Sequence, residues 1–206
     1  MTANTTAYEL MFQTAKEWLS GADPEEIARL CGLTWNAEEQ VFAFQTLGRD
    51  VRLTWPALTA EPELENWHML VLLHYLYRGD GVPPAGIKLS PADMKDGLIR
   101  GGKFAFTAER SFARMLRNKP AETIASAFST IGAERVPGKA DFEYRIPFLP
   151  HFPVYVSIYL ADEDFPASGK FFVDAAADHY LSIEDAVTVG DLVLSMLEKK
   201  MGKRTI

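Results

Sequence analysis

Cysteine is nearly absent from this sequence. Cys31 is the only one among 206 residues, so a single chain cannot form an internal disulfide bond or supply the several thiolates of a zinc or iron–sulfur site. We therefore expect no iron–sulfur cluster within this chain, and a cytoplasmic, reducing location fits the same absence. Cys31 is expected at the end of a helix, where the negative end of the helix dipole disfavours a reactive thiolate.

Long hydrophobic runs are absent as well. The longest apolar stretch, from Met69 to Tyr77, is too short to cross a bilayer and includes His74. Residues 1–19 lack a basic segment followed by an apolar one, so we expect no signal peptide. Both absences predict a soluble protein with no membrane partner.

Positive charge is also scarce. The sequence has 21 Lys and Arg against 28 Asp and Glu, a formal net charge of -7. Nucleic acids attract proteins through clustered basic side chains, and the only such cluster lies in residues 199–206, which we expect to form a frayed, solvated tail. Nucleic acid is therefore excluded as a partner, and the oligomeric state is left open.

Hydrophobic residues, in contrast, are plentiful. They make up 48% of the chain, enough for a single compact α+β domain spanning residues 1–206. Apolar residues at helical spacing predict N-terminal helices within residues 6–31, the second of them opened by Asp23 and Pro24 and ended by Gly32. Further helices are expected from Leu64 to Tyr77, from Thr107, from Pro120 and from Ser182.

Alternating apolar and polar residues predict an antiparallel sheet of about five strands, with the helices packed against it. The strands are a hairpin at residues 41–55, with Gly48 in its turn, and single strands near 142–147, 153–160 and 169–174. Residues 78–102 are rich in glycine and proline. We predict that they form a long ordered loop, a feature that is often functional.

Three consecutive carboxylates, Asp162, Glu163 and Asp164, lie between two predicted strands. Like charges this close repel one another unless something compensates. A divalent cation bound by these oxygens, with Asp174 and Asp178 as further ligands, is one solution. The alternative is a solvated hairpin tip whose acids accept hydrogen bonds from backbone N–H groups.

The histidines are candidates of a different kind. His74 lies within an apolar helix, where a core residue satisfied by hydrogen bonds is the commoner role, although histidine also serves as a metal ligand or general base. His68 is six residues earlier and faces elsewhere on the helix. His179 lies beside Asp178 and is a second metal candidate, whereas His151 is expected to be structural.

Arg110 is the candidate for anion binding. If it points inward it needs a carboxylate partner, and the acidic loop supplies several. Residues 101–103, Gly-Gly-Lys before a predicted helix, could cradle a phosphate, but they lack the rest of a phosphate-binding loop, and paired glycines usually serve a turn.

Several segments together carry a resemblance to a known family. They are Leu72–Leu76, Phe104–Arg110, Asp162–Pro166, and Asp174 with Tyr180–Leu181 and Glu184–Asp185. In order and spacing they resemble the uncharacterised prokaryotic family known as domain of unknown function 3786, over roughly Tyr8 to Leu197. The resemblance implies a protein of anaerobic bacteria or archaea, without an established activity. Some relatives carry an added Cys-rich iron–sulfur module, which Cys31 alone cannot provide.

These observations lead to one candidate pocket and three functional hypotheses. The pocket residues are Arg110, His74, Tyr75, Asp162, Glu163, Asp164 and Asp174. The first hypothesis is a non-catalytic module of anaerobic metabolism that binds a small molecule or a protein partner. The second is a metal-dependent enzyme that uses the acidic loop with His74 or His179. The third is an assembly protein without a small-molecule site.

Overall fold

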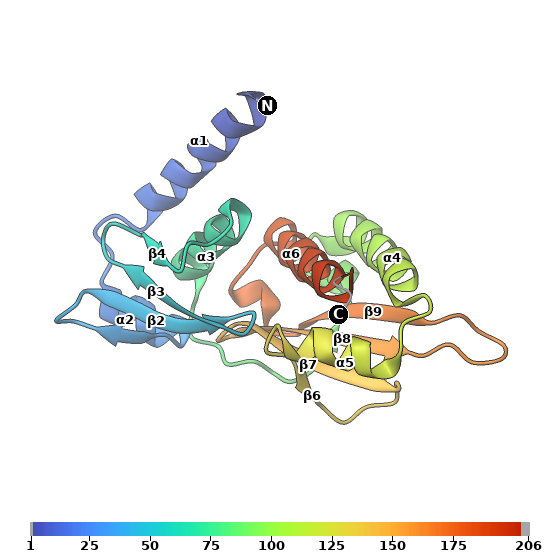
Figure 1. Ribbon diagram of the computed structural model, residues 1–206. Helices are drawn as coiled ribbons and strands as arrows, with labels where there is room; N and C mark the ends of the chain where they lie inside the picture. The colour runs from blue at the N-terminus through green and yellow to red at the C-terminus, as the bar shows by residue number, and fades with distance from the viewer. Residues whose placement is uncertain (1, 203–206) are drawn as a thin grey trace.

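The computed structural model describes residues 2–202. This part of the chain has six α-helices, two short 3-10 helices and two antiparallel sheets (Figure 1). The helices are α1 (Thr2–Trp18), α2 (Pro24–Cys31), α3 (Asn66–Arg78), η1 (Pro91–Asp93), α4 (Gly97–Leu116), α5 (Ala121–Ser129), η2 (Ala177–His179) and α6 (Ile183–Gly202). The predicted α+β class and antiparallel pairing are confirmed. Of the helices in residues 2–202, none has the length and apolarity that crossing a lipid bilayer requires.

The strands divide into two sheets, whereas the sequence predicted one. The first sheet has the order β1-β2-β3-β4 and the second the order β5-β9-β8-β7-β6. The strands are β1 (Thr34–Asn36), β2 (Val41–Thr46), β3 (Arg49–Thr54), β4 (Ala60–Glu61), β5 (Lys88–Leu89), β6 (Glu134–Arg135), β7 (Phe142–Leu149), β8 (Phe152–Tyr159) and β9 (Ser168–Asp174).

The predicted hairpin is present as β2 and β3, but both of its edges are occupied by very short neighbouring strands. β1 pairs with β2 and β4 pairs with β3. Closing these short connections costs less chain entropy than bringing in a strand about a hundred residues away. Strands of two or three residues carry too little alternation to be recognised in the sequence, which is why the separate sheet was not predicted.

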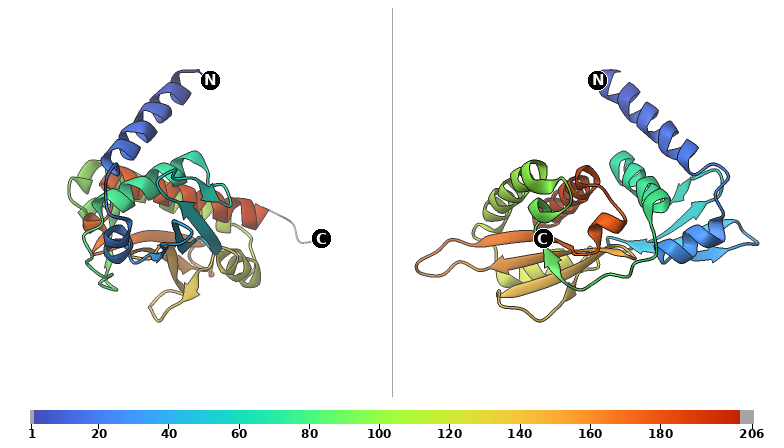
Figure 2. Two further views of the ribbon diagram at one scale, coloured as in Figure 1. Left: turned by 90° about the vertical axis from the view of Figure 1, so that its left-hand side faces the viewer. Right: turned by 180° about the vertical axis from the view of Figure 1, so that it is seen from behind.

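The N-terminal helices follow their sequence signals. The Asp23 side chain accepts a hydrogen bond from the Glu25 N–H at the start of α2, and Gly32 ends the helix in the left-handed conformation, as predicted. The N-terminal end of α1 extends away from the rest of the molecule, whereas from Tyr8 onward the helix contacts α3 (Figures 1 and 2). One side of α1 is therefore left open above α3.

The second sheet is covered on one face by helices. α4 and α6 lie over the face that carries Val154, Val156 and Ile158 (Figure 2). α5 contacts α6 and stacks Phe128 on Tyr144 of β7 at the side of this layer. α6 continues through Lys199 and Lys200 to Gly202, so these two lysines are helical and not part of a frayed tail. The rest of the predicted tail, residues 203–206, lies outside the described part of the chain.

α4 begins ten residues earlier than predicted, at Gly97, and Thr107 is in its middle. Gly101 is the reason: a Cβ atom there would lie 2.1 Å from the Pro91 carbonyl oxygen, so only glycine permits the helix to pack on η1. The predicted loop 78–102 is thus shortened by β5, η1 and the first turn of α4. Residues 101–103 are helical and do not precede a helix, as a phosphate cradle would require.

A contact between two turns joins the two sheets. Gly48, in the β2–β3 turn, has a φ of +71° and packs directly against the backbone of Gly132, after α5. A side chain on either glycine would collide with the other turn. This contact brings Leu47 and Arg49, which flank Gly48, towards α6.

Candidate functional site

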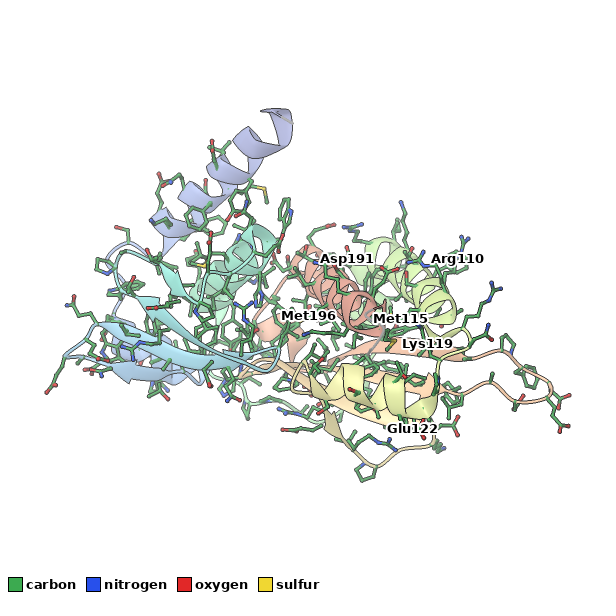
Figure 3. The ribbon with its side chains drawn as sticks, viewed as in Figure 1. Arg110, Met115, Lys119, Glu122, Asp191 and Met196 are labelled. Atoms are coloured by element: carbon green, nitrogen blue, oxygen red, sulfur yellow. The ribbon has the colours of Figure 1, made fainter. Side chains whose placement is uncertain are left out.

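Arg110 does not form the expected pocket. It lies on the exposed side of α4, and its guanidinium packs over the Phe106 ring at 5.7 Å, still on the surface (Figure 3). Its position follows from helical geometry: Phe104, Ala108 and Phe112 are buried, and Arg110 is on the opposite side of the helix. The condition for the candidate pocket, an Arg110 side chain that points inward, is therefore not met.

The acidic loop is a solvated hairpin tip. Asp162, Glu163 and Asp164 are all exposed between β8 and β9. Asp162 Oδ1 accepts hydrogen bonds from the N–H groups of Asp164 (2.9 Å) and Phe165 (2.7 Å), so the loop supplies the donors for its own leading carboxylate. A hollow of about 570 Å³ lies between the base of this loop and the end of α4, but neither Arg110 nor any of the three acids lines it.

Asp174 is buried, and its carboxylate links two segments of the chain through hydrogen bonds. Its carboxylate accepts hydrogen bonds from the N–H groups of Ala85, Gly86 and Ala176, at 2.7 to 2.9 Å, and from the Tyr155 hydroxyl at 2.9 Å. Burial, followed by the bond to Asp174, raises the pKa of Tyr155 to about 12. Every oxygen of Asp174 is thus engaged in fastening the segment after α3 to β9, which leaves none for a ligand.

Tyr75 is structural as well. The side chain is fully buried, its hydroxyl donates to the Cys31 carbonyl at 2.6 Å, and it accepts from the His151 N–H at 3.0 Å. His151 in turn bonds the Tyr180 hydroxyl, which confirms its expected structural role. Burial raises the pKa of the Cys31 thiol to about 12, so it is an unreactive core residue.

The expected metal ligands do not gather. His179 pairs with Asp80 at 2.6 Å on the surface, and Asp178 accepts from the Lys95 N–H. Within the part of the chain that the structure describes, no three His, Cys, Asp or Glu side chains come together as a metal site would require.

A cleft of about 730 Å³ lies elsewhere, bounded by α1, the β2–β3 turn, α3, the start of α4, and α6. Its volume is in the range of small-molecule sites. Apolar side chains from four of these elements line it: Met11, Leu47, Leu70, Val71, Leu192 and Met196. Met196 extends from the side of α6 that faces α3 (Figure 3).

Charged side chains surround this apolar lining. Arg49 of β3 and Asp191 and Lys199 of α6 have no ion-pair partner among the described residues. Partial burial among the neighbouring side chains raises the pKa of the Asp191 carboxyl, whereas the positive charge of Arg100 acts to lower it. Arg49 donates one hydrogen bond, to the Glu63 carbonyl, so most of its N–H donors remain available.

A buried neutral histidine lines the cleft beside Arg49. His68 Nε2 bonds the Thr46 hydroxyl at 2.9 Å, and its ring stacks on Phe148. Burial, assisted by the positive charge of Arg49, lowers the pKa of His68 to about 4. His68 is therefore uncharged near neutral pH, and the positive charge of this wall belongs to Arg49.

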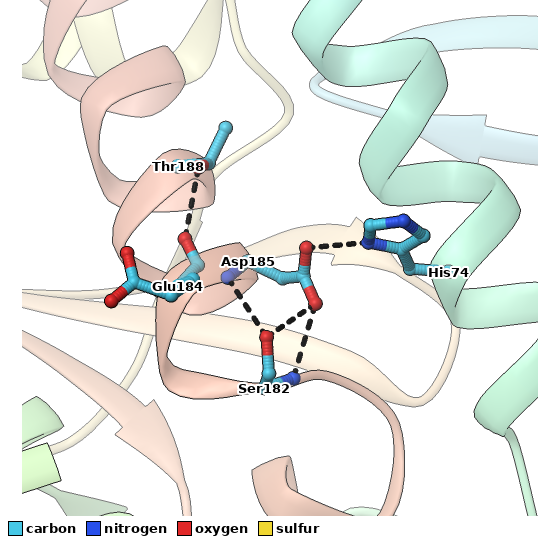
Figure 4. Close-up of polar contacts among 5 residues, drawn as sticks. All are labelled: His74, Ser182, Glu184, Asp185 and Thr188. Atoms are coloured by element: carbon cyan, nitrogen blue, oxygen red, sulfur yellow. Dashed lines mark hydrogen bonds and ion pairs between the residues drawn. The ribbon is translucent and has the colours of Figure 1, made fainter. Parts of the chain in front are cut away.

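At the other end of α3, His74 connects the helix to α6. Its Nδ1 is 2.7 Å from Asp185 Oδ1, while Asp185 Oδ2 accepts from the hydroxyl (2.6 Å) and the N–H (3.2 Å) of Ser182 (Figure 4). Burial raises the pKa of Asp185, but the hydrogen bonds from His74 and Ser182 outweigh it, and the net pKa is lowered. The carboxylate is thus held ionised with a histidine on one side and a helix N-cap on the other.

Most of these cleft residues were missed by sequence reasoning. Ser182 was expected only as the start of a helix, and Asp185 was noted only among the segments that resemble the family; together they form a capping box. A signal was present in α6: Glu184, Thr188, Asp191, Ser195 and Lys199 recur at helical spacing on a helix whose other residues are mostly apolar. A polar stripe of this kind indicates an open face, although it cannot show what lies opposite.

Comparison with known proteins gives one finding. No curated protein and no solved structure matches the chain. One family model matches residues 23–196, which include both sheets, α3 and most of α6, and hence the cleft except for Met11 and Lys199. The chain therefore belongs to the family described as domain of unknown function 3786.

Proposed function

We propose that this protein is a ligand-binding module whose site is the cleft between α3 and α6. The observation that carries the proposal is the combination in one cleft of an apolar lining and an arginine with unused donors. Apolar walls supply most of the binding free energy of a small molecule, and a few polar groups fix its orientation. The ligand that suits these walls is an elongated organic molecule with an apolar body and one anionic group, directed to Arg49.

The proposal includes the setting in which the protein acts. We place it in the cytoplasm of an anaerobic prokaryote, as part of anaerobic metabolism, with support from the single thiol of Cys31 and from the family resemblance. No nucleic acid is among the proposed partners, because the net charge is -7. No metal or iron–sulfur cluster enters the proposed binding step.

The direct test uses anilinonaphthalene sulfonate (ANS), a fluorescent probe with an apolar ring body and one anionic group. We expect saturable binding of one ANS per folded chain, measured by fluorescence and by calorimetry. Arg49→Ala should weaken binding by about tenfold, because a charge-assisted hydrogen bond is lost. Arg52→Ala is the matched control: it removes the same charge from the same strand, but Arg52 pairs with Glu39 outside the cleft.

A second pair of variants tests the location. Met196→Trp places a large ring in the cleft and should abolish ANS binding. Phe106→Trp, at an exposed position of α4 outside the cleft, should leave it unchanged. Equal ANS affinity for the wild type, Arg49→Ala and Met196→Trp would refute the proposed site.

A further inference from the structure

His74 lies where three of the elements that bound the cleft meet. Asp185 of α6 contacts it on one side, and the Trp18 ring of α1 lies 5.7 Å from the imidazole on another. Met11 and Trp18 are seven residues apart and so share one side of α1, and Met11 lines the cleft. Val71, three residues before His74 on the same side of α3, and Asp185 line it as well. His74 is not itself one of the lining residues, but it lies directly behind two of them, Val71 and Asp185, at the edge of the cleft.

The two nitrogens of His74 have different surroundings. Nδ1 faces the ionised Asp185 and so carries the proton of that hydrogen bond; in the neutral imidazole the lone pair is then on Nε2. Nε2 has no hydrogen-bond partner among the described residues, yet it is not one of the buried unsatisfied atoms, so solvent reaches it. Figure 4 shows the ring held edge-on to Asp185 with its other nitrogen directed away from the carboxylate.

We propose that His74 is a proton acceptor for the ligand held in this cleft, with Asp185 as the residue that positions it. The proposal rests on the proposed ligand-binding function and adds reactivity to it. In the step, the X–H bond of the ligand breaks, its proton bonds to Nε2, and the electron pair stays on the ligand. The imidazolium that results is stabilised by the adjacent Asp185 carboxylate, as in other Asp–His pairs.

The positions of the two groups define the class of ligand. Arg49 acts beside His68, and His74 is six residues further along α3, which is about 9 Å along a helix axis. The ligand is thus an organic acid whose ionisable O–H, S–H or activated C–H lies well away from its anionic group, towards the later turns of α3.

A reactive analogue of ANS tests the free lone pair of His74. The iodoacetamide derivative IAEDANS has the same naphthalene sulfonate body. When IAEDANS is bound in the cleft, His74 Nε2 attacks the CH₂ carbon of the iodoacetamide group. An N–C bond forms as the C–I bond breaks, and iodide leaves. We expect one label per chain, located on His74 by mass spectrometry and prevented by excess ANS. Cys31→Ala serves as background, so that no thiol competes.

Asp185→Asn tests the positioning role. The Ser182 N–H must donate, so the amide oxygen of Asn turns to it and the NH₂ group faces His74 Nδ1. That arrangement forces the proton onto Nε2 and should slow labelling by about tenfold or more. Nitrogen NMR of the imidazole should show the exchanged tautomer, a change that a merely structural role would not produce. His74→Gln, which keeps a polar side chain, should abolish the label.

The outcomes separate the two proposals. Labelling of His74 that ANS blocks and Asp185→Asn slows supports the inference. ANS binding without labelling of His74, or equal labelling rates in the wild type and Asp185→Asn, overturns it and leaves the binding function standing. Absence of saturable ANS binding overturns the proposed function itself.

Discussion

Two sets of carboxylates in this protein behave in opposite ways. Asp162, Glu163 and Asp164 are adjacent in sequence and exposed, and their hydrogen bonds stay within the loop. Asp174 and Asp185 are 1% and 9% exposed, and each bonds groups about 90 to 110 residues away. The comparison teaches that a cluster of charge in a sequence marks solvent contact more readily than a site. A single acid among apolar residues must find a partner, because burying it alone would cost several kcal/mol.

The largest difference in the free energy of unfolding should appear between variants that lack a buried carboxylate and variants that lack an exposed one. We expect Asp174→Ala to lower the free energy of unfolding by roughly 3 kcal/mol, because three N–H groups and a hydroxyl lose their acceptor. Asp164→Ala is the control at the exposed tip and should change it by less than about 0.5 kcal/mol. Urea denaturation measures both, and equal losses would break the comparison.

The histidines should show the same contrast between buried and exposed groups in the dependence of stability on pH. His68 has a pKa of about 4 in the folded protein and about 6.5 when unfolded, so between these values the unfolded chain binds more protons. Stability is therefore fully present above pH 6.5 and falls as the pH drops towards 4, by about 3 kcal/mol.

The measurement is urea denaturation at a series of pH values between 4 and 7. His68→Gln, which cannot be charged, should flatten this part of the profile. The matched control is His179→Gln, in an exposed pair with Asp80, which should retain the loss of stability that His68 produces. A slope unchanged by His68→Gln would show that other groups govern it.

Asp185 should show an intermediate effect. Asp185→Asn keeps the shape of the side chain but loses the charged partner of His74, and we expect a loss of roughly 2 kcal/mol near neutral pH. Because the folded pKa of Asp185 is lowered, its contribution is present above the unfolded value and disappears as the pH falls through the folded one. The stabilities of the wild type and the variant should therefore begin to converge as the pH falls below about 4, near the unfolded pKa. Parallel profiles at every pH would contradict the assigned ionisation.

The smallest effect is expected at Arg110. Arg110→Ala removes only a surface contact with Phe106, so stability should change by less than about 0.5 kcal/mol. ANS affinity should also stay the same, in contrast to Arg49→Ala. Weaker ANS binding by Arg110→Ala would indicate that ANS binds near Arg110, as the pocket expected from the sequence predicts, and not in the cleft.

Local patterns predicted much of the fold. The cap at Asp23, the left-handed Gly32, the hairpin at Gly48 and the Ser182 capping box all rest on groups within a few residues of one another. Long alternating strands were found for the same reason. The start of α4 was not, because it depends on Gly101 fitting against Pro91.

The candidate site could not be predicted from local patterns. The expected pocket grouped residues by chemical type, but Arg110 and Asp162–Asp164 lie on exposed surfaces, and Asp174 is fully used by backbone donors. His74 alone of these residues lies beside the cleft. Its partner, Asp185, had been noted only among the segments that resemble the family.

By itself, the sequence determined the α+β class, the helix caps and the hairpin tip at Asp162, because these depend on the chemistry of near neighbours. Only the tertiary structure decided that the strands form two sheets, that Gly48 meets Gly132, and that a cleft remains between α3 and α6. The pairing of His74 with Asp185, 111 residues apart, belongs to the second group. Neither residue's own neighbours specify that contact. It is set by how two helices pack, and therefore by the shape of the whole core.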